Sequence, residues 1–257
     1  MKQAHNHQDI DDRTEALRDL VSEYPDVWRD FLTNFELSWI YHENAIEGIV
    51  VTHAEMTSAL RGKPISVDTY HAIRNQKRAI RQVKRLSSER SGPIDLDLVL
   101  LLHSTLSEGS RDSEEPYRKI IPLHRTYFHD IAQPASISLR LGKLMDWARA
   151  NVPDEEDAVR FAAQFHHEFM GIFPFPNHSG KTGRLLLNYV LLKHGYMPVL
   201  FHATERQRYF DTFRHSPKEM ERLLVEMMNN CVDNAETHMR RAIAEREKLA
   251  TRRLRAV

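Results

Sequence analysis

The sequence predicts an all-α protein with one small β-hairpin. Apolar residues recur at the three- and four-residue spacing of an amphipathic helix along almost all of the 257 residues. Only residues 116–134 lose this period, and there aromatic and apolar residues stand among prolines, histidines and arginines. No internal repeat and no long linker divides the chain. Together these observations predict a single all-α domain that carries a hairpin flap.

The first helices are marked by their capping residues. Asp26 is a common N-cap residue type and precedes a broad apolar helix face over residues 27–40. Thr52 and Glu55 have the spacing of a capping box and predict a short helix. Residues 67–86 predict a longer helix whose basic outer face we interpret as a solvated surface.

The second half of the chain continues the helical period. Helices are expected over residues 95–106, 136–150, 155–171, 181–194 and 204–214, and from residue 217 into the basic C-terminal end. We predict four regions. These are a polar N-terminal segment with a first helix (1–25), a helical region (26–62), a core (63–215) and a C-terminal helix with a basic tail (216–257).

Composition excludes several classes of function. The 36 lysines and arginines balance the 36 aspartates and glutamates, so no net charge attracts the chain to nucleic acid or to a membrane surface. No apolar run approaches the roughly 20 residues that cross a bilayer. The single cysteine, Cys231, cannot form an internal disulfide and fits a reducing compartment. We expect a cytoplasmic protein, although an effector exported without a cleaved signal would look the same. The sequence is compatible with a homo-oligomer.

Residues 172–184 have the residue types of an anion-binding site. They form a loop between two helical segments, and this loop brings Lys181 and Arg184 to the start of the second helix. Unpaired backbone N–H groups and the helix dipole favour phosphate at such a position. The predicted phosphate-binding residues are Ser179, Gly180, Lys181, Thr182, Gly183 and Arg184.

This loop resembles the signature of the Fic/Doc family, His-Pro-Phe-x-Asp/Glu-Gly-Asn-Gly-Arg-x-x-Arg. The resemblance extends over about residues 30–240 and includes Asn75–Gln76–Lys77–Arg78–Ala79 and Gly195–Tyr196–Met197–Pro198. It implies a Fic-like helical core and relatives that transfer AMP from ATP to proteins. Residues 117–130 take the place of the family's flap, which docks a protein target by strand addition. The positions that match the signature are Pro174, Phe175, Gly180, Thr182, Gly183 and Arg184.

A second segment resembles the family's inhibitory motif, Ser/Thr-x-x-x-Glu-Gly/Asn. Residues 43–48 read Glu-Asn-Ala-Ile-Glu-Gly, so region 26–62 is expected to be of the inhibitory type. The resemblance implies that Glu47 reaches Arg184, where the γ-phosphate of a nucleotide would bind. Glu43 stands in place of the motif's serine or threonine. Glu47 could act as a brake on the site or as a structural ion pair.

The departures from the signature affect its chemistry. Phe173 replaces the catalytic histidine, and it cannot take a proton from a target hydroxyl; a lost general base lowers rates by about 10²–10⁴. Asn177 replaces the acidic Mg²⁺ ligand with a neutral carbonyl, so we predict no metal site there. Lys181 replaces an arginine and loses its planar fork. His178 and Ser179 replace a glycine and an asparagine.

Three functions compete. We favour a binding protein, either a pseudo-enzyme or a regulatory partner, that retains ATP, another nucleotide or a phosphorylated ligand but does not perform ordinary histidine-dependent AMP transfer. The alternative is an active transferase or other enzyme of altered chemistry. It would use His178 as base, because an unperturbed histidine pKa of about 6.5 suits proton transfer. A nucleic-acid binder is the weakest of the three, given the zero net charge.

Overall fold

The computed structural model describes residues 7–63, 66–89, 93–109, 116–122, 129–154 and 157–255, and it confirms the all-α class. The described residues contain no strand. The middle of the expected hairpin, residues 123–128, lies outside the described residues, so the flap stays a prediction. The helices are α1 (Gln8–Glu23), α2 (Pro25–Ile46), α3 (His53–Leu60), α4 (Val67–Ser88), α5 (Leu96–Ser107), α6 (Ile137–Ala150), α7 (Ala158–Ile172), α8 (Ser179–Lys193), α9 (Arg206–Thr212) and α10 (Pro217–Arg255), with the 3-10 turns η2 (Pro134–Ser136) and η3 (Ala203–Glu205).

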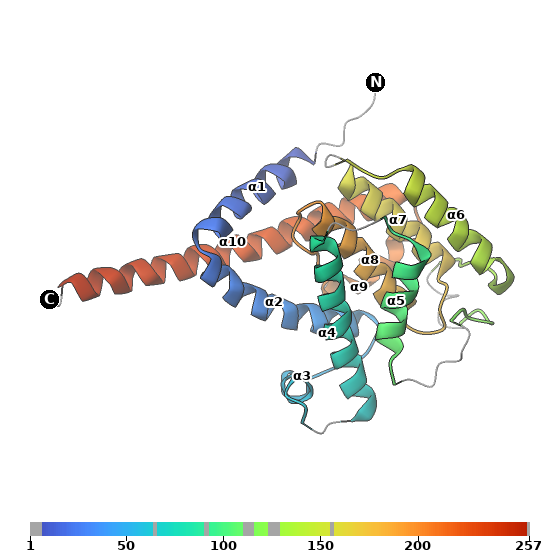
Figure 1. Cartoon of the computed structure of the whole chain (residues 1–257), viewed down its shortest axis with the longest axis horizontal. Coiled ribbons are helices and arrows are strands. Elements are labelled where there is room, and N and C mark those ends of the chain that lie inside the picture. The colour runs from blue at the N-terminus through green and yellow to red at the C-terminus, as the bar shows by residue number, and fades with distance from the viewer. Residues whose placement is uncertain are drawn as a thin grey trace.

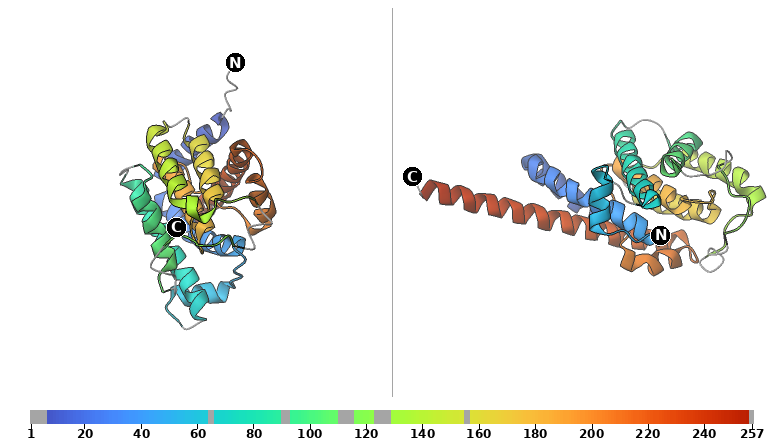
Figure 2. Two further views of the ribbon diagram at one scale, coloured as in Figure 1. Left: turned by 90° about the vertical axis from the view of Figure 1, so that its right-hand side faces the viewer. Right: turned by 90° about the horizontal axis from the view of Figure 1, so that it is seen from below.

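Helix α8 is the centre of the molecule. It packs against α4, α5 and α7, and every residue from Ser179 to Leu191 is buried. Helix α10 packs against α7, α1 and α2. Its C-terminal part extends beyond the other helices, as two of the views show (Figures 1 and 2). Because α8 is covered on all sides, a ligand could reach its first turn only by displacing the side chains that lie on that turn.

Side-chain caps begin α3, α4 and α5. The capping box of Thr52 and Glu55 is confirmed at α3, and the Asp95 carboxylate accepts the Leu98 N–H at the start of α5. The prediction that Asp26 is an N-cap is wrong. Pro25 opens α2 instead, because its missing N–H costs nothing there, and Asp26 lies in the first turn, where its charge suits the helix dipole.

The structure also describes the single cysteine and the apolar character of the helices. Cys231 is buried, and burial raises the pKa of its thiol to about 11, so it is an inert core residue. Within the described parts of the chain, no helix combines the length and the apolar character that crossing a bilayer requires.

Candidate functional site

The first end of the loop between α7 and α8 is part of the core. Phe173 ends α7 in a left-handed conformation, with φ of 47°, and only 3% of it is exposed. A non-glycine residue in this region of backbone space carries strain and must be held by its surroundings. The position that the resemblance assigns to the catalytic histidine therefore carries a buried hydrocarbon ring.

Arg118 holds this end of the loop, and the sequence reasoning did not identify it as a site residue. Its buried guanidinium donates to the carbonyls of Phe173 (2.7 Å), Ile172 (3.2 Å) and Ala132, and its backbone N–H donates to the Pro174 carbonyl at 2.9 Å. The last carbonyls of a helix lack partners within that helix, and a cation satisfies them well. The only signal in the sequence was a charged residue in the segment that lacks a helical period.

The middle of the loop is fixed by Ser179 and Phe175. The Ser179 hydroxyl accepts the Phe175 N–H at 2.8 Å and donates to the Phe175 carbonyl at 3.0 Å. The Phe175 ring stacks on His103 with 3.7 Å between centroids. His178, which lies between Phe175 and Ser179 in the sequence, is half-buried. It takes the N-cap position of α8 in a left-handed conformation, with φ of 63°. Helix α8 therefore begins at Ser179 and not at the expected Lys181, and the Ser179 side chain serves the turn.

Arg184 is the most heavily engaged residue of the loop. It is completely buried, and its Nε donates to Glu43 Oε2 at 2.8 Å while a terminal nitrogen donates to Glu47 Oε1 at 2.9 Å. Burial works against its charge, but Glu43, Tyr209 and Glu47 outweigh that and hold the Arg184 pKa well above its ordinary value. The contact between Glu47 and Arg184 is the one that the resemblance implied. The contact with Glu43 was not foreseen.

Lys181 is the second cation of the cluster. It is 1% exposed, and its Nζ donates to Asn44 Oδ1 at 2.7 Å. Burial lowers the Lys181 pKa to about 8, although Glu47 and Glu43 both act to raise it. Burial also raises the pKa of the Glu43 carboxyl, while Arg184 acts to lower it. Because the arginine keeps its charge and bonds this carboxylate directly, we regard Glu43 as ionised at neutral pH.

A tyrosine and a histidine complete the cluster from α9 and α7. The Tyr209 hydroxyl lies 3.3 Å from an Arg184 terminal nitrogen and 2.8 Å from His166 Nε2. Arginine can only donate, so the Tyr209 oxygen accepts from Arg184, and the same hydroxyl is hydrogen-bonded to His166 Nε2. Burial, followed by the charge of Arg184, lowers the His166 pKa to about 3, so this histidine is neutral. His167 points elsewhere and bonds the His215 carbonyl at 2.9 Å.

Two glycines of the loop make room for this cluster. A Cβ at Gly180 would collide with the Glu47 carboxylate, and one at Gly183 would lie 3.0 Å from Phe169 and 3.2 Å from His166. Gly180 thus admits the carboxylate, and Gly183 lets α8 approach α7. The predicted phosphate-binding residues, 179–184, are all buried. Carboxylates of α2 now lie on the cation that was expected to meet a phosphate.

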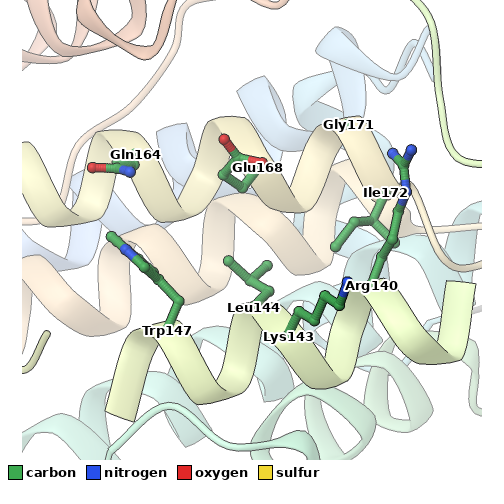
Figure 3. Close-up of a pocket in the computed structure, with 8 residues that line it drawn as sticks. All are labelled: Arg140, Lys143, Leu144, Trp147, Gln164, Glu168, Gly171 and Ile172. Atoms are coloured by element: carbon green, nitrogen blue, oxygen red, sulfur yellow. The ribbon is translucent and has the colours of Figure 1, made fainter. Parts of the chain in front are cut away.

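A surface cavity lies between α6 and α7, away from this cluster. Its volume is about 360 Å³, and none of residues 179–184 lines it. Figure 3 shows that side chains from both helices surround it. The lining residues are Arg140, Lys143, Leu144, Trp147, Gln164, Glu168, Gly171 and Ile172. It is a mixed-charge surface groove that does not reach Lys181 or Arg184.

The donor set at the loop does not suit Mg²⁺. Asn177 is exposed and offers a neutral carbonyl where the family signature has a carboxylate. Within the described ranges, no group of three or more histidine, cysteine, aspartate or glutamate side chains is placed to hold a metal ion.

Known proteins share both the sequence pattern and the fold. Residues 93–191 match the model of the Fic/DOC family. The "Protein adenylyltransferase Fic" of Nematostella vectensis is 27% identical over 181 residues, 67% of this chain and 41% of that protein. The protein of that name from Culex quinquefasciatus is 26% identical over 202 residues, 76% of this chain and 39% of that protein. The chain thus spans about two fifths of the length of the curated relatives it matches.

Solved structures show the same fold. A Fic-domain signalling protein from Bacteroides thetaiotaomicron has a TM-score of 0.75 and 18% identity, over 93% of this chain and 97% of that chain. Fic-1 from C. elegans has a TM-score of 0.73 and 20% identity, over 91% of this chain and 73% of that chain. A Fic domain in complex with adenylylated Cdc42 has a TM-score of 0.51 and 14% identity, over 87% and 88%. Residues 93–191 thus match the Fic/DOC family, and the chain as a whole shares the fold of Fic-domain structures.

Proposed function

We propose that this chain is a Fic-fold protein that binds a phosphate-bearing ligand, such as a nucleotide, at the start of α8 and does not perform ordinary histidine-dependent AMP transfer. One observation carries the proposal. The Arg184 guanidinium, in the first two turns of α8, already holds anionic oxygens at 2.8 and 2.9 Å. Those oxygens belong to Glu43 and Glu47 of a neighbouring helix, so a phosphate that displaced them would meet the same donors.

The absence of ordinary AMP transfer follows from the first end of the loop. Phe173 has no atom that accepts a proton, and its ring is buried. The histidine that does contact the cluster, His166, is neutral and already hydrogen-bonded to the Tyr209 hydroxyl, and its low pKa makes it a poor base at neutral pH. Asn177 supplies no anionic metal ligand.

A protein partner is part of the proposal. The curated relatives carry the name protein adenylyltransferase, and one structural neighbour is bound to adenylylated Cdc42. By the same fold, residues 117–130 would receive a segment of a partner protein. In the described part of this region, Arg118 and the Ala132 N–H, which bonds the Gly171 carbonyl at 2.9 Å, fasten both sides of the flap to the end of α7.

Isothermal titration calorimetry with ATP, ADP and AMP, each with and without Mg²⁺, tests the binding. We expect at least one nucleotide to bind, with an affinity that Mg²⁺ does not raise. Lys181→Met keeps the side-chain volume but removes a buried cation, and we expect it to weaken binding about tenfold. Lys193→Met, at the other end of α8, is the matched control and should bind as the wild type does. No binding of any phosphate ligand would leave only an interaction role.

A second candidate function rests on His178. It is the histidine inside the loop, and its left-handed backbone at the N-cap of α8 is the kind of local strain that occurs at functional sites. An enzyme of altered chemistry could use it as a base. Intact mass spectrometry after incubation with nucleotides would detect transfer. If transfer occurs and His178→Ala abolishes it, this second function replaces the first; if His178→Ala leaves transfer unchanged, the role of His178 is excluded.

A further inference from the structure

Two carboxylates, and not one, neutralise Arg184. The family motif provides a single glutamate, which is Glu47 here, while Glu43 stands where the motif has a serine or threonine. In this chain Glu43 makes the shorter contact, 2.8 Å from Arg184 Nε, and it is the more buried of the two, with 6% of its side chain exposed against 19% for Glu47. Removing Glu47 alone would leave the guanidinium bonded to a buried anion.

The two contacts lie on one edge of the guanidinium. Nε and the terminal nitrogen that bonds Glu47 donate in parallel directions, and such an edge is the geometry that binds two oxygens of a single phosphate or carboxylate. One phosphate group could therefore replace both glutamates at Arg184. To do so, the phosphate would have to displace the two glutamate side chains that now accept the hydrogen bonds of these donors.

Charge balance restricts which phosphate can do this. Lys181 and Arg184 carry two positive charges in a buried cluster, and Glu43 and Glu47 compensate them. A buried charge that loses its partner is strongly unfavourable. A terminal phosphate carries about −1.5 to −2 charges at neutral pH and preserves the balance, whereas an internal phosphodiester brings only one.

Both glutamates can leave together. Glu43 lies in the last turn of α2, and Glu47 follows four positions later as the C-cap residue of that helix. The final turn is tied down by the Asn44 amide to the Ile40 carbonyl (2.8 Å) and by Arg206 Nε to the Ile46 carbonyl (2.8 Å). A movement of this end of α2 by a few ångströms would withdraw both carboxylates from Arg184.

We propose that Glu43 is a second internal competitor at Arg184, and that the site opens only when a ligand with a terminal, dianionic phosphate displaces Glu43 and Glu47 together. This inference rests on the proposed function, because it assumes that the start of α8 binds phosphate. It adds the ligand class and the second residue that gates the site.

The test is calorimetric titration of ATP into the full chain and its Glu43→Gln, Glu47→Gln and double variants. Glutamine keeps the shape and an acceptor oxygen but removes the charge. We expect each single change to raise ATP affinity no more than about threefold and the double change to raise it at least about 30-fold, since the two carboxylates share one partner. In the double variant, AMP should bind at least about tenfold tighter than cyclic AMP, which carries a single internal charge.

Controls separate the possible failures. Glu36→Gln, on the same helix and paired with Lys84 at 3.0 Å, should leave ATP affinity unchanged. If Glu47→Gln alone reaches the affinity of the double variant, Glu43 is no competitor, although the proposed phosphate binding stands. If no variant binds any phosphate ligand while circular dichroism shows that all are folded, both proposals are overturned. Equal binding of AMP and cyclic AMP would refute the ligand class alone.

A second measurement needs no variant. The amides of Glu47, Gly48 and Ile49 bond the carbonyls of Asn44 and Ala45 at 2.9–3.1 Å at the end of α2. Saturating ATP should speed their hydrogen exchange at least about threefold, because ligand binding withdraws this turn. Unchanged exchange in protein that calorimetry shows to be saturated would refute the displacement of α2.

Discussion

The two ends of the loop between α7 and α8 contrast in how they have departed from the family signature. At the first end, Phe173 places a buried ring where the signature has a histidine, and Arg118 holds the backbone around it. At the second end, Lys181 and Arg184 remain charged in a site that excludes water, each with partners from α2. A buried ion costs far more than a buried hydrocarbon unless it is paired. The first end is part of the core, whereas the second holds two buried cations, and carboxylates lie on Arg184.

The strongest way to break this contrast is to remove the central cation. Arg184→Met would leave Glu43 and Glu47 without a partner in a buried cluster. We expect the free energy of unfolding to fall by about 3–5 kcal/mol, measured by urea denaturation at pH 7. The control is Arg208→Met, which loses only exposed ion pairs to Glu205 and Glu226 and should change stability by no more than about 1 kcal/mol. If both variants lost the same free energy of unfolding, the buried ion pairs of Arg184 would contribute no more to stability than exposed ones.

The next effect is expected at the first end of the loop. Arg118→Met would leave the carbonyls of Ile172, Phe173 and Ala132 without their donor. Buried acceptors without partners are costly, so we expect a loss of about 2–4 kcal/mol in the same assay. Arg149→Met removes an exposed pair with Asp146 and serves as the reference. A loss below about 1 kcal/mol would show that other groups hold this end.

A third substitution tests whether the missing base alone prevents AMP transfer. Phe173→His restores the signature residue in a buried position, and we expect it to lower stability by about 1–3 kcal/mol, because the ring polar atoms lose water. We expect no detectable AMP transfer by intact mass spectrometry with MgATP, since Asn177 and the two carboxylates on Arg184 remain. Clear adenylylation by this single variant would show that Asn177 and the two carboxylates on Arg184 do not prevent AMP transfer.

The smallest effect concerns the attachment of α2. His42 accepts the Ala203 N–H at 3.2 Å and stacks on His202, and burial, with His202, lowers its pKa to about 4. The folded state therefore binds fewer protons at this site than the unfolded state between about pH 4 and 6.5. Stability from His42 is complete above pH 6.5 and is lost as the pH falls toward 4. Partial exposure keeps the slope below an upper bound of about 1.4 kcal/mol per pH unit.

His42→Asn tests this dependence. The asparagine oxygen can accept the Ala203 N–H in place of Nδ1 but does not titrate in this range. Urea unfolding measured from pH 7 to 4 should show a shallower loss of stability than in the wild type. Parallel curves for the two proteins would exclude His42 as the source of the pH dependence at this joint.

Local patterns in the sequence predicted most of the helices, because helix periodicity and capping are properties of neighbouring residues. The capping box at Thr52 is of this kind, and so is the loop that brings Lys181 and Arg184 to a helix start. The exception at Asp26 arose because Pro25 is equally suited to a helix start, and the pattern did not distinguish them. The resemblance to a known family added the contact between Glu47 and Arg184.

What the sequence by itself determined is thus the all-α class and the loop between α7 and α8, while the missing base at Phe173 stays a prediction. Only the tertiary structure decided that Glu43 shares Arg184, that Tyr209 links Arg184 to His166, and that Arg118 holds the loop. The reason is distance along the chain: Glu43 and Arg184 are 141 positions apart, and Arg118 and Phe173 are 55 apart. Whether a charge is partnered depends on which helices pack together, and no local pattern records that.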